Sequence, residues 1–422
     1  MSAEWPRRKV IDLQECGILL VEDGNHGEYR PRRHEFTTSG TAFIRAADMN
    51  DGSVLFDTAE RINDEALNRI RKGVGKPGDV LFSHKGTVGK LALVPLDAPP
   101  FVCSPQTTFW RCLDDSALDR RFLHCFMRSS EFQDQWFARK GETDMADYVS
   151  LTAQRQLVVA VPSIAEQRAI SEIVGALDDK IELNQQMNVT VERIATALFV
   201  RWYSQQQSVD EDFPAATELV EAGVMVINDG YRAKRSELGS SGLPFVRAGN
   251  LHDDGVDLSG ADILRDESVL RAGSKVSQPL DVAFTSKGTV GRMTLVSAES
   301  SQFVYSPQVC FWRATNTAML SPHVLYHWMR SDEFFDQVDR VKGQTDMADY
   351  VSLTDQRRMR ITLPLGERQN GIRDKLSLLH DRIAATSLES QTLSKTRNLL
   401  LPRLLSGEIR LRDAEKLIEE VA

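Results

Sequence analysis

The segment Thr143-Asp144-Met145-Ala146-Asp147-Tyr148-Val149-Ser150-Leu151-Thr152 occurs twice in this chain, the second time unchanged as Thr345 to Thr354. The copies lie 202 residues apart, and an identity of this length has no plausible chance origin. The same offset relates Lys85-Gly86-Thr87-Val88-Gly89 to Lys287 to Gly291, and Ser104-Pro105-Gln106 to Ser306 to Gln308. Because a unit of about 200 residues is far longer than a solenoid repeat, the sequence predicts one domain duplicated once.

Composition narrows the class of protein. The 422 residues suffice for two or three domains, and 41% hydrophobic with 26% charged residues is typical of a globular protein, which excludes disordered, collagen-like and disulfide-scaffold chains. The start of the chain does not resemble a signal peptide, and no run of eighteen apolar residues occurs, so we expect a cytoplasmic protein without a membrane partner. The net charge of −9 counts against nucleic acid as a partner unless cations gather in local patches.

The duplication also serves as an internal alignment for reactive residues. A site that the fold needs twice should appear in both copies. The five cysteines and eight histidines find no identical counterpart: Cys103 faces Tyr305, and His327 faces Cys125. The sequence therefore predicts no metal site and no Cys/His catalytic site. A catalytic role for Asp144 and Asp147 is disfavoured, since no duplicated catalytic constellation with His or Lys accompanies them.

Each repeat has two parts. The first is a mixed α/β domain of about 160 residues, in which short β-like runs are separated by Gly and Pro turns. A helical stretch with an aromatic stripe from Phe122 to Phe137 follows, over 120–139, and its counterpart runs over 322–341. The second part is a long helix. We expect the first mixed α/β domain over 1–162, its long helix over 163–204, the second mixed α/β domain over 205–364, and the C-terminal long helix and tail over 365–422.

The long helices carry apolar residues at alternating spacings of three and four. Ser163 and Glu166 resemble an N-terminal capping signature for the first helix. A stripe of this length with polar flanks favours a coiled-coil seam over two independent surface helices. Asn184 and Thr386 occupy equivalent seam positions, where polar groups can define the register. The expected seam residues are Ile170, Val174, Leu177, Ile181, Asn184, Val191 and Leu198, with Ile372, Leu376, Leu379, Ile383, Leu393 and Leu400.

The predicted fold is α+β: two similar mixed α/β domains joined by two long helices that form an antiparallel coiled coil, with pseudo-twofold symmetry. A helix of about 35 residues spans about 50 Å, close to one and a half turns of B-DNA. The helix pair would therefore act as a ruler between the two domains.

A basic loop is duplicated as well. Tyr29-Arg30-Pro31-Arg32-Arg33 aligns with Tyr231-Arg232-Ala233-Lys234-Arg235. Three cations and a tyrosine recur in both copies although the loop before them differs in length by four residues, which favours phosphate contact over a merely solvated loop.

Three further polar segments are candidates for DNA contact: the Lys-Gly-Thr-Val-Gly segment, the Ser-Pro-Gln segment, and the polar loop over 139–145 that leads to Tyr148. The Lys-Gly-Thr-Val-Gly segment lacks the full spacing of a nucleotide-binding P-loop, and we interpret it as a hairpin tip that contacts DNA or, alternatively, as a structural turn. Gln106 and Gln308 suit either base readout or hydrogen bonding at a strand end. The expected DNA-binding residues are Arg30, Arg32, Arg33, Arg45, His84, Lys85, Thr87, Gln106, Glu142, Thr143 and Tyr148 in the first copy, and Arg232, Lys234, Arg235, Arg247, Ser286, Lys287, Thr289, Gln308, Gln344, Thr345 and Tyr350 in the second.

From end to end, these features resemble the specificity subunit of type I restriction–modification systems. The resemblance rests on the two Lys-Gly-Thr-Val-Gly and two Thr-Asp-Met-Ala-Asp-Tyr-Val segments within the duplicated architecture. It rests also on Asp23-Gly24-Asn25-His26-Gly27-Glu28 before the basic loop, Pro162 with Glu166-Gln167, Ala197-Leu198-Phe199, and Leu404-Leu405-Ser406-Gly407-Glu408-Ile409.

The resemblance implies two target-recognition domains, each reading one half of a split double-stranded DNA sequence. The helices would set the spacing and dock two adenine-methylating modification subunits, which restriction and translocase subunits would join. S-adenosylmethionine, ATP and Mg²⁺ are then expected on those partners, and no cofactor on this chain. The alternatives are a methylation-only or other defence complex, and a protein-binding coiled-coil scaffold.

Positions where otherwise matched loops differ are candidates for reading different bases. These pairs are His84 with Ser286, Glu142 with Gln344, and Asp48 with Asn250. In the major groove a Glu accepts from cytosine N4, whereas a Gln suits adenine. The sequence predicts similar half-sites, related by approximate inversion, that differ at one or two bases.

Overall fold

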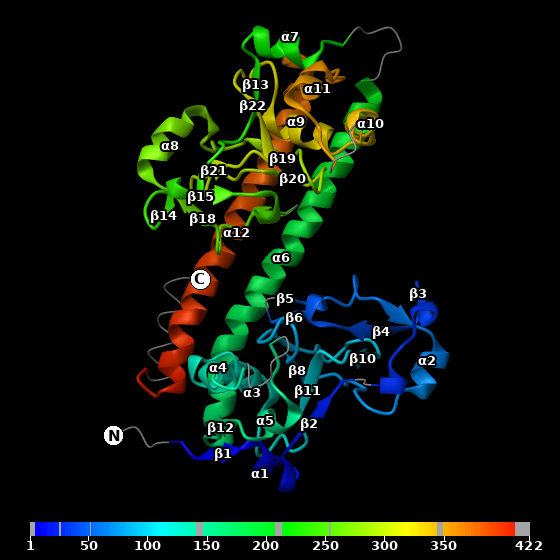
Figure 1. Ribbon diagram of the computed structural model, residues 1–422, viewed down its shortest axis with the longest axis vertical. Coiled ribbons are helices and arrows are strands. Elements are labelled where there is room, and N and C mark those ends of the chain that lie inside the picture. The colour runs from blue at the N-terminus through cyan, green and yellow to red at the C-terminus, as the bar shows by residue number, and fades with distance from the viewer. Residues whose placement is uncertain are drawn as a thin grey trace. The chain divides into compact units, whose positions relative to one another are not determined.

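The computed structural model describes residues 5–24, 27–50, 52–140, 147–206, 213–252, 255–343 and 349–409. The chain folds into two compact units, visible in Figure 1. Unit 1 combines Met1–Glu182 with Gln391–Ala422, and unit 2 is Leu183–Ser390. Each unit therefore contains one mixed α/β portion and a part of both long helices. The linear boundaries at 162, 204 and 364 remain predictions, since they assign each long helix to a segment of its own.

The central sheet of unit 1 is antiparallel and is buried on both faces. Its third strand is fully buried, and its second presents Trp110 to one hydrophobic core and Phe109 to another. The Trp110 core contains helices, and the Phe109 core contains residues of the second sheet, so both faces of the central sheet are covered. The sheet has the order β2 (Leu19–Asp23), β11 (Thr107–Cys112), β8 (Val80–Ser83) and β9 (Leu91–Leu93).

A second sheet completes the mixed α/β portion of unit 1. It pairs β10 and β4 in parallel and its other strands in antiparallel. Its order is β10 (Phe101–Cys103), β4 (Thr41–Ile44), β7 (Arg61–Ile62) and β3 (Phe36–Thr37). Short pairs join β1 (Arg7–Lys9) to β12 (Val158–Ala160) and β5 (Met49–Asn50) to β6 (Ser53–Val54), and short helices are α1 (Val10–Glu15), α2 (Asp64–Arg69) and α5 (Leu151–Arg155).

Unit 2 repeats the topology of both four-stranded sheets, as the duplication predicts, whereas the β1–β12 pair is reduced, among the described residues, to a single bridge between Ala215 and Arg360. Its central sheet has the order β13 (Met225–Asp229), β22 (Val309–Ala314), β19 (Val282–Thr285) and β20 (Met293–Leu295). Its second sheet has the order β14 (Leu238–Gly239), β18 (Asp262–Leu264), β15 (Leu243–Val246) and β21 (Val304–Tyr305), and β16 (Leu251–His252) pairs with β17 (Gly255–Val256). Its short helices are α7 (Ala216–Glu221), α8 (Asp266–Ala272) and α11 (Leu353–Arg358).

The helical stretch predicted over 120–139 is divided into α3 (Arg120–Met127) and α4 (Ser130–Phe137). Ser129 separates them, because its hydroxyl accepts a hydrogen bond from Phe132 N at 3.3 Å and caps the second helix. Ser331 caps in the same way between α9 (Pro322–Met329) and α10 (Asp332–Val341). The aromatic stripe is buried as predicted except at its last member, Phe137, which is 64% exposed.

The two long helices are α6 (Ile164–Gln206) and α12 (Asn370–Leu405). The predicted capping signature of α6 is confirmed, since Ser163 N donates to a Glu166 carboxylate oxygen at 3.1 Å and Glu166 N donates to Ser163 Oγ at 3.4 Å. Within the described ranges, no helix is long and apolar enough to span a bilayer.

The helices pair antiparallel, as unit 2 shows. Asn184 Nδ2 donates to Glu389 Oε2 at 2.8 Å, and Asn188 Nδ2 donates to Ser387 Oγ at 3.0 Å, so residue numbers rise along α6 while they fall along α12. The predicted register residue Asn184 is buried, and Thr386 Oγ1, also buried, donates to Asn188 Oδ1.

The apolar stripes are more than an interhelical seam. In unit 1 they share one core with the aromatic helix α3, and in unit 2 with α9. The helix pair therefore also serves as a wall of each α/β portion, which a seven-residue pattern alone does not reveal. Ile170, Val174, Leu177, Ile181, Leu393 and Leu400 are buried in unit 1, Ile372 and Leu376 are buried in unit 2, and Val191, Leu198, Leu379 and Ile383 are half-buried.

Candidate nucleic-acid interface

Three polar segments that lie far apart in the sequence meet at one edge of the central sheet of unit 1. Gly86 N donates to Asp147 O at 3.0 Å, and Val149 N donates to His84 O at 2.8 Å. His84 N donates to Gln106 O at 2.9 Å. These backbone bonds join the Lys-Gly-Thr-Val-Gly loop to the Ser-Pro-Gln turn and to the segment that carries Tyr148.

Unit 2 contains the same three bonds. Gly288 N donates to Asp349 O at 3.0 Å, Val351 N donates to Ser286 O at 2.9 Å, and Ser286 N donates to Gln308 O at 3.0 Å. The convergence is therefore a property of the duplicated fold.

Glycines allow the close backbone approach that this convergence requires. A Cβ on Gly24 would lie 1.8 Å from Ser104 O, and one on Gly230 would lie 2.1 Å from Ser306 O. Because neither glycine has a side chain, the end of β2 and the end of β13 can each lie directly against the Ser-Pro-Gln turn of the same unit. Within the Lys-Gly-Thr-Val-Gly loop, Gly86 has φ +78°, a backbone conformation that residues other than glycine rarely adopt.

The convergence brings four predicted contact residues together in each unit, which we call the contact cluster. It consists of Lys85, Thr87, Gln106 and Tyr148 in unit 1, and Lys287, Thr289, Gln308 and Tyr350 in unit 2. The two lysine ammonium groups lie over the tyrosine rings, 5.8 and 5.9 Å from their centroids. Lysine, threonine and glutamine side chains are exposed in both copies, and no described residue forms an ion pair with either lysine. Both cations are thus available for an anion outside the chain.

Both tyrosines of the contact cluster are neutral donors. Partial burial raises the pKa of Tyr148, with a smaller contribution from the charge of Asp23. Burial also raises the pKa of Tyr350, and the charge of Arg232 opposes this effect. The arrangement offers cations, a hydroxyl, an amide and aromatic rings on one surface, a combination suited to phosphates and base edges.

The basic loops are exposed in both units, and no described residue forms an ion pair with their cations. The loops are nevertheless held in place by a carboxylate. Glu35 accepts a hydrogen bond from Arg32 N at 2.7 Å, and Arg69 holds the same buried carboxylate through bonds of 2.5 and 2.7 Å. These hydrogen bonds lower the pKa of Glu35 to about 2, and the bond from Arg69 makes the largest contribution.

The corresponding pair in unit 2 is Glu237 with Arg271, at 2.7 Å, and Glu237 also accepts from Lys234 N at 2.7 Å. The hydrogen bond from Lys234 N is the main cause of a lowered pKa at Glu237. Sequence reasoning missed both Glu–Arg pairs, although each member recurs at the offset of 202 residues and the internal alignment contained the signal.

A second duplicated residue that was missed is the buried Gln154, with its counterpart Gln356. Gln154 Nε2 donates to Val149 O at 3.0 Å, and its Oε1 accepts from Trp110 Nε1 at 3.2 Å. Gln356 makes the equivalent bonds to Val351 O and Trp312 Nε1, at 3.1 and 2.9 Å. These side chains link the tyrosine-bearing segments to the hydrophobic cores.

Several predicted contact residues need correction. His84 and Ser286 are fully buried, so neither can reach a base. Asp48 and Asn250 cap short turns instead of facing outward: Asp48 Oδ2 accepts from Arg45 N at 2.8 Å, and Asn250 Oδ1 accepts from the backbone N of the residue three positions earlier at 2.9 Å. Of the three pairs expected to read different bases, these two are therefore set aside.

The arginines that precede these turns are engaged within the chain. Arg45 bonds Glu60 at 2.7 Å, and Arg247 bonds Asp262 at 2.5 Å. Arg45 and Arg247 are therefore less available for phosphate contact than the cations of the basic loops. Glu142, Thr143, Gln344 and Thr345 lie outside the described residues, and so does Asp144 of the disfavoured catalytic pair.

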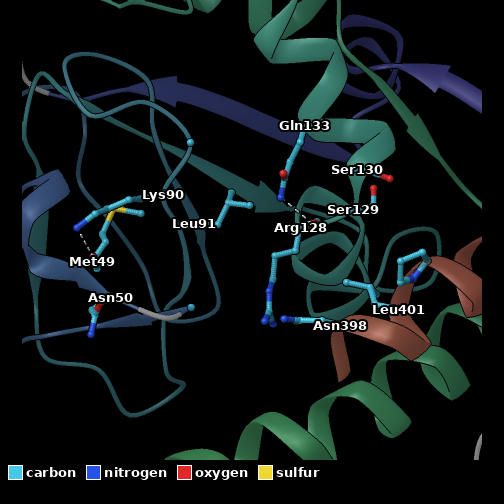
Figure 2. Close-up of a pocket in the computed structure, with 13 residues that line it drawn as sticks. Met49, Asn50, Lys90, Leu91, Arg128, Ser129, Ser130, Gln133, Asn398 and Leu401 are labelled. Carbon is cyan, nitrogen blue, oxygen red and sulfur yellow. Dashed lines mark hydrogen bonds between the residues drawn. The ribbon is translucent and has the colours of Figure 1, made fainter. Parts of the chain in front are cut away.

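A cavity of about 390 Å³ lies in unit 1 at the base of the 85–89 loop, and Figure 2 shows its lining. Lys90 Nζ donates to the backbone oxygen of Met49 at 2.9 Å, and Arg128 forms an ion pair with Asp178 at 2.7 Å, so both cations of the lining are engaged within the chain. The contact cluster does not line this cavity. The described ranges also contain no group of three or more His, Cys, Asp or Glu side chains that could hold a metal ion. The best-supported site is thus an exposed polar surface.

Comparisons with known proteins agree with this description. Residues 22–193 match a family model described as the type I restriction modification DNA specificity domain. The chain is 20% identical over 430 residues to the type I restriction enzyme MjaIX specificity subunit of Methanocaldococcus jannaschii, covering 97% of this chain and 94% of that protein. It is 28% identical over 213 residues to the HindI specificity subunit of Haemophilus influenzae, covering 49% of this chain and 43% of that protein.

A solved structure shares the fold. The S subunit of a type I restriction–modification system from M. genitalium superposes with a TM-score of 0.54 at 13% identity, over 96% of each chain. At this identity the likeness concerns the fold alone.

Proposed function

We propose that the chain is a specificity subunit of a type I restriction–modification system, as the family match over residues 22–193 and the likeness to curated specificity subunits support, and that each unit reads one half of a split double-stranded DNA target. As a specificity subunit the chain is non-catalytic and recognises DNA. In the proposal it directs adenine methylation and DNA cleavage that partner subunits carry out.

The observation that carries the proposal is the duplicated contact cluster. Two units present the same lysine, threonine, glutamine and tyrosine on the same backbone framework, each with an exposed basic loop. A bipartite DNA target requires two such surfaces, whereas a protein-binding scaffold gives no reason to retain unpaired cations twice.

The negative net charge bears on how the chain binds. With a charge of −9, a few local cations must overcome a repulsive background. We therefore expect weak DNA binding by this subunit alone and much tighter binding by its complex.

The long helices are the proposed docking surface for two methyltransferase subunits. Each helix exposes large apolar side chains although its other face is buried: Leu183 is 58% exposed, Val200 56%, Leu378 71% and Leu399 60%. Exposed apolar residues in such number favour a protein partner. Restriction and translocase subunits would join this complex, S-adenosylmethionine, ATP and Mg²⁺ would be held by the partners, and the assembly would act in the cytoplasm.

The shared contact residues also support similar half-sites, related by approximate inversion and different at one or two bases. With two of the three candidate pairs set aside, the pair Glu142 and Gln344 remains a proposed source of a direct cytosine-versus-adenine difference.

Methylome sequencing of the native host with and without this gene tests the proposal. We expect a bipartite adenine-methylated sequence with a fixed spacer that disappears in the deletion strain. Two unrelated half-sites would overturn the predicted similarity, and an unchanged methylome would overturn the function. Purification of the native complex then shows whether restriction subunits are present or the system only methylates.

A salt-dependent mobility shift with duplex DNA and the purified methyltransferase subunit distinguishes the scaffold alternative. A DNA reader requires a shift that weakens steeply with salt. A scaffold requires none.

A further inference from the structure

The two contact clusters have the same outward residues but rest on different buried ones. The segments that carry the tyrosines are identical in sequence, and so are the Lys-Gly-Thr-Val-Gly loops. Directly behind the tyrosines, however, unit 1 has His84 and unit 2 has Ser286, and both are fully buried.

In unit 1 the imidazole of His84 supports Tyr148. The two ring centroids lie 5.3 Å apart with an interplanar angle of 49°. His84 Nδ1 is 3.2 Å from Val149 O, next to the tyrosine, and His84 Nε2 is 3.5 Å from Asp23 Oδ1 at the end of β2. Tyr148 is therefore in contact on two sides, with Lys85 over its ring and His84 behind it.

In unit 2 the position behind the tyrosine is occupied differently. The hydroxyl of Ser286 accepts a bond from Cys310 Sγ at 3.1 Å and so belongs to the core. Asp229, the counterpart of Asp23, pairs with Lys275 Nζ at 2.7 Å. Tyr350 has no aromatic ring from position 286 behind it, and it is 42% exposed.

We propose that His84 is a positioning residue that makes unit 1 the more discriminating of the two readers. A tyrosine already held by a ring and by a lysine loses less conformational freedom on binding than one held by the lysine alone, which strengthens its contact with the correct half-site. Identical contact residues can therefore serve two half-sites with unequal strictness. This inference rests on the proposed DNA-reading function.

The test uses the complex of the full chain with its methyltransferase subunit and duplexes in which one half-site of the mapped target is scrambled. His84→Ser, which installs the residue of unit 2, should weaken binding about three- to tenfold on duplexes that keep the half-site of unit 1. Binding to duplexes that keep only the other half-site should change by less than about twofold. His84→Phe, which keeps a ring behind Tyr148, should retain most of the affinity.

Two further measurements separate positioning from phosphate contact and from damage to the fold. His84→Ser should leave the salt dependence of binding unchanged, whereas Lys85→Gln should reduce its slope by about one. Ser286→Ala is the matched variant in unit 2 and should have less than about twofold effect on either duplex.

The inference is overturned if His84→Ser binds its half-site like the wild type, or if His84→Phe loses as much affinity as His84→Ser. An equal loss on both duplexes would also overturn it. By contrast, a wild-type complex that prefers neither half-site over scrambled DNA would contradict the proposed function itself.

Discussion

At the scale of single residues, the exposed cations of the basic loops are the simplest part of the proposed interface to test. Replacing Arg232, Lys234 and Arg235 with glutamine should weaken binding to every duplex alike, because phosphate contacts carry no sequence information. If each cation contacts one phosphate, the slope of log affinity against log salt should fall by about three. Titrations of the complex at several salt concentrations measure both quantities. An unchanged slope would mean that the loop faces only water.

The Glu35 carboxylate, which holds the basic loop of unit 1, should make the stability of the fold depend on pH. Hydrogen bonds lower the pKa of Glu35 to about 2 from the ordinary value of 4.5, so the unfolded chain binds the proton more tightly than the folded chain. The stabilisation is then complete above about pH 4.5 and is lost as the pH falls towards 2. Glu35→Gln should lower the melting temperature at pH 7 and flatten its fall between pH 4.5 and 2. Glu15→Gln, at the exposed end of α1, is the control and should preserve the wild-type pH profile.

Which side chains face outward was only partly predictable from the sequence. Lys85 and Tyr148 were identified because their segments recur and because polar loops follow apolar runs. His84 was misjudged since all four residues of the preceding strand β8 are buried, so alternation along that strand gives no information about the next residue. Its backbone oxygen accepts a bond from Val149 N, which lies 65 residues later in the chain. A long-range contact of this kind leaves no local pattern.

At the scale of elements, one carboxylate joins three helices of unit 1. Asp178 on α6 accepts from Arg128, which follows α3, at 2.7 Å and from Arg397 on α12 at 2.6 Å. Asp178→Asn should cost about 2 kcal/mol, because Arg397 is almost fully buried and would lose its charged partner. The neighbouring Asp179 pairs with Arg121 on the exposed surface, and Asp179→Asn should cost less than about 0.5 kcal/mol.

Urea unfolding of the full chain, followed by hydrogen exchange, checks this prediction. The loss should appear at amides of unit 1 and leave those of unit 2 unchanged. Equal costs for the two substitutions would show that the junction is no stronger than a surface ion pair.

The helices themselves were predictable in a way that their surroundings were not. The spacing of apolar residues and the Ser163 capping signature indicated both the existence and the start of α6. The stripe could not show that its residues also complete the cores beside α3 and α9, because a periodic pattern reports that a face is buried and not what covers it. The division between α3 and α4 was missed because the cap at Ser129 is a single hydrogen bond within an otherwise continuous apolar pattern.

At the scale of the whole molecule, the two units differ in how they use the chain. Unit 2 is one continuous segment, whereas unit 1 needs Gln391–Ala422 to complete it. Four leucines from that segment are buried in the core of unit 1: Leu393, Leu400, Leu401 and Leu404. Removing a buried leucine side chain typically costs about 2–5 kcal/mol, and a whole domain is stable by only about 5–15 kcal/mol.

A chain that ends at Ser390 should therefore lose the protection of unit 1 and keep that of unit 2. Its complex should retain only the half-site of unit 2. Hydrogen exchange of the truncated chain measures the first effect, and binding to half-scrambled duplexes the second. A chain that ends at Ile409 keeps all four leucines and is the control. Equal loss in both units would show that they fold as one cooperative body.

The same division of the chain has a consequence for biosynthesis. During translation, unit 2 is complete once Ser390 has left the ribosome, while unit 1, whose residues are made first, still lacks one wall of its core. The core of unit 1 therefore exposes apolar surface until Gln391–Ala422 has also been synthesised and has left the exit tunnel. We accordingly expect chaperones to bind mainly unit 1, whose first residues are synthesised first. A premature stop codon near the end of the gene should likewise destabilise unit 1 and leave unit 2 folded.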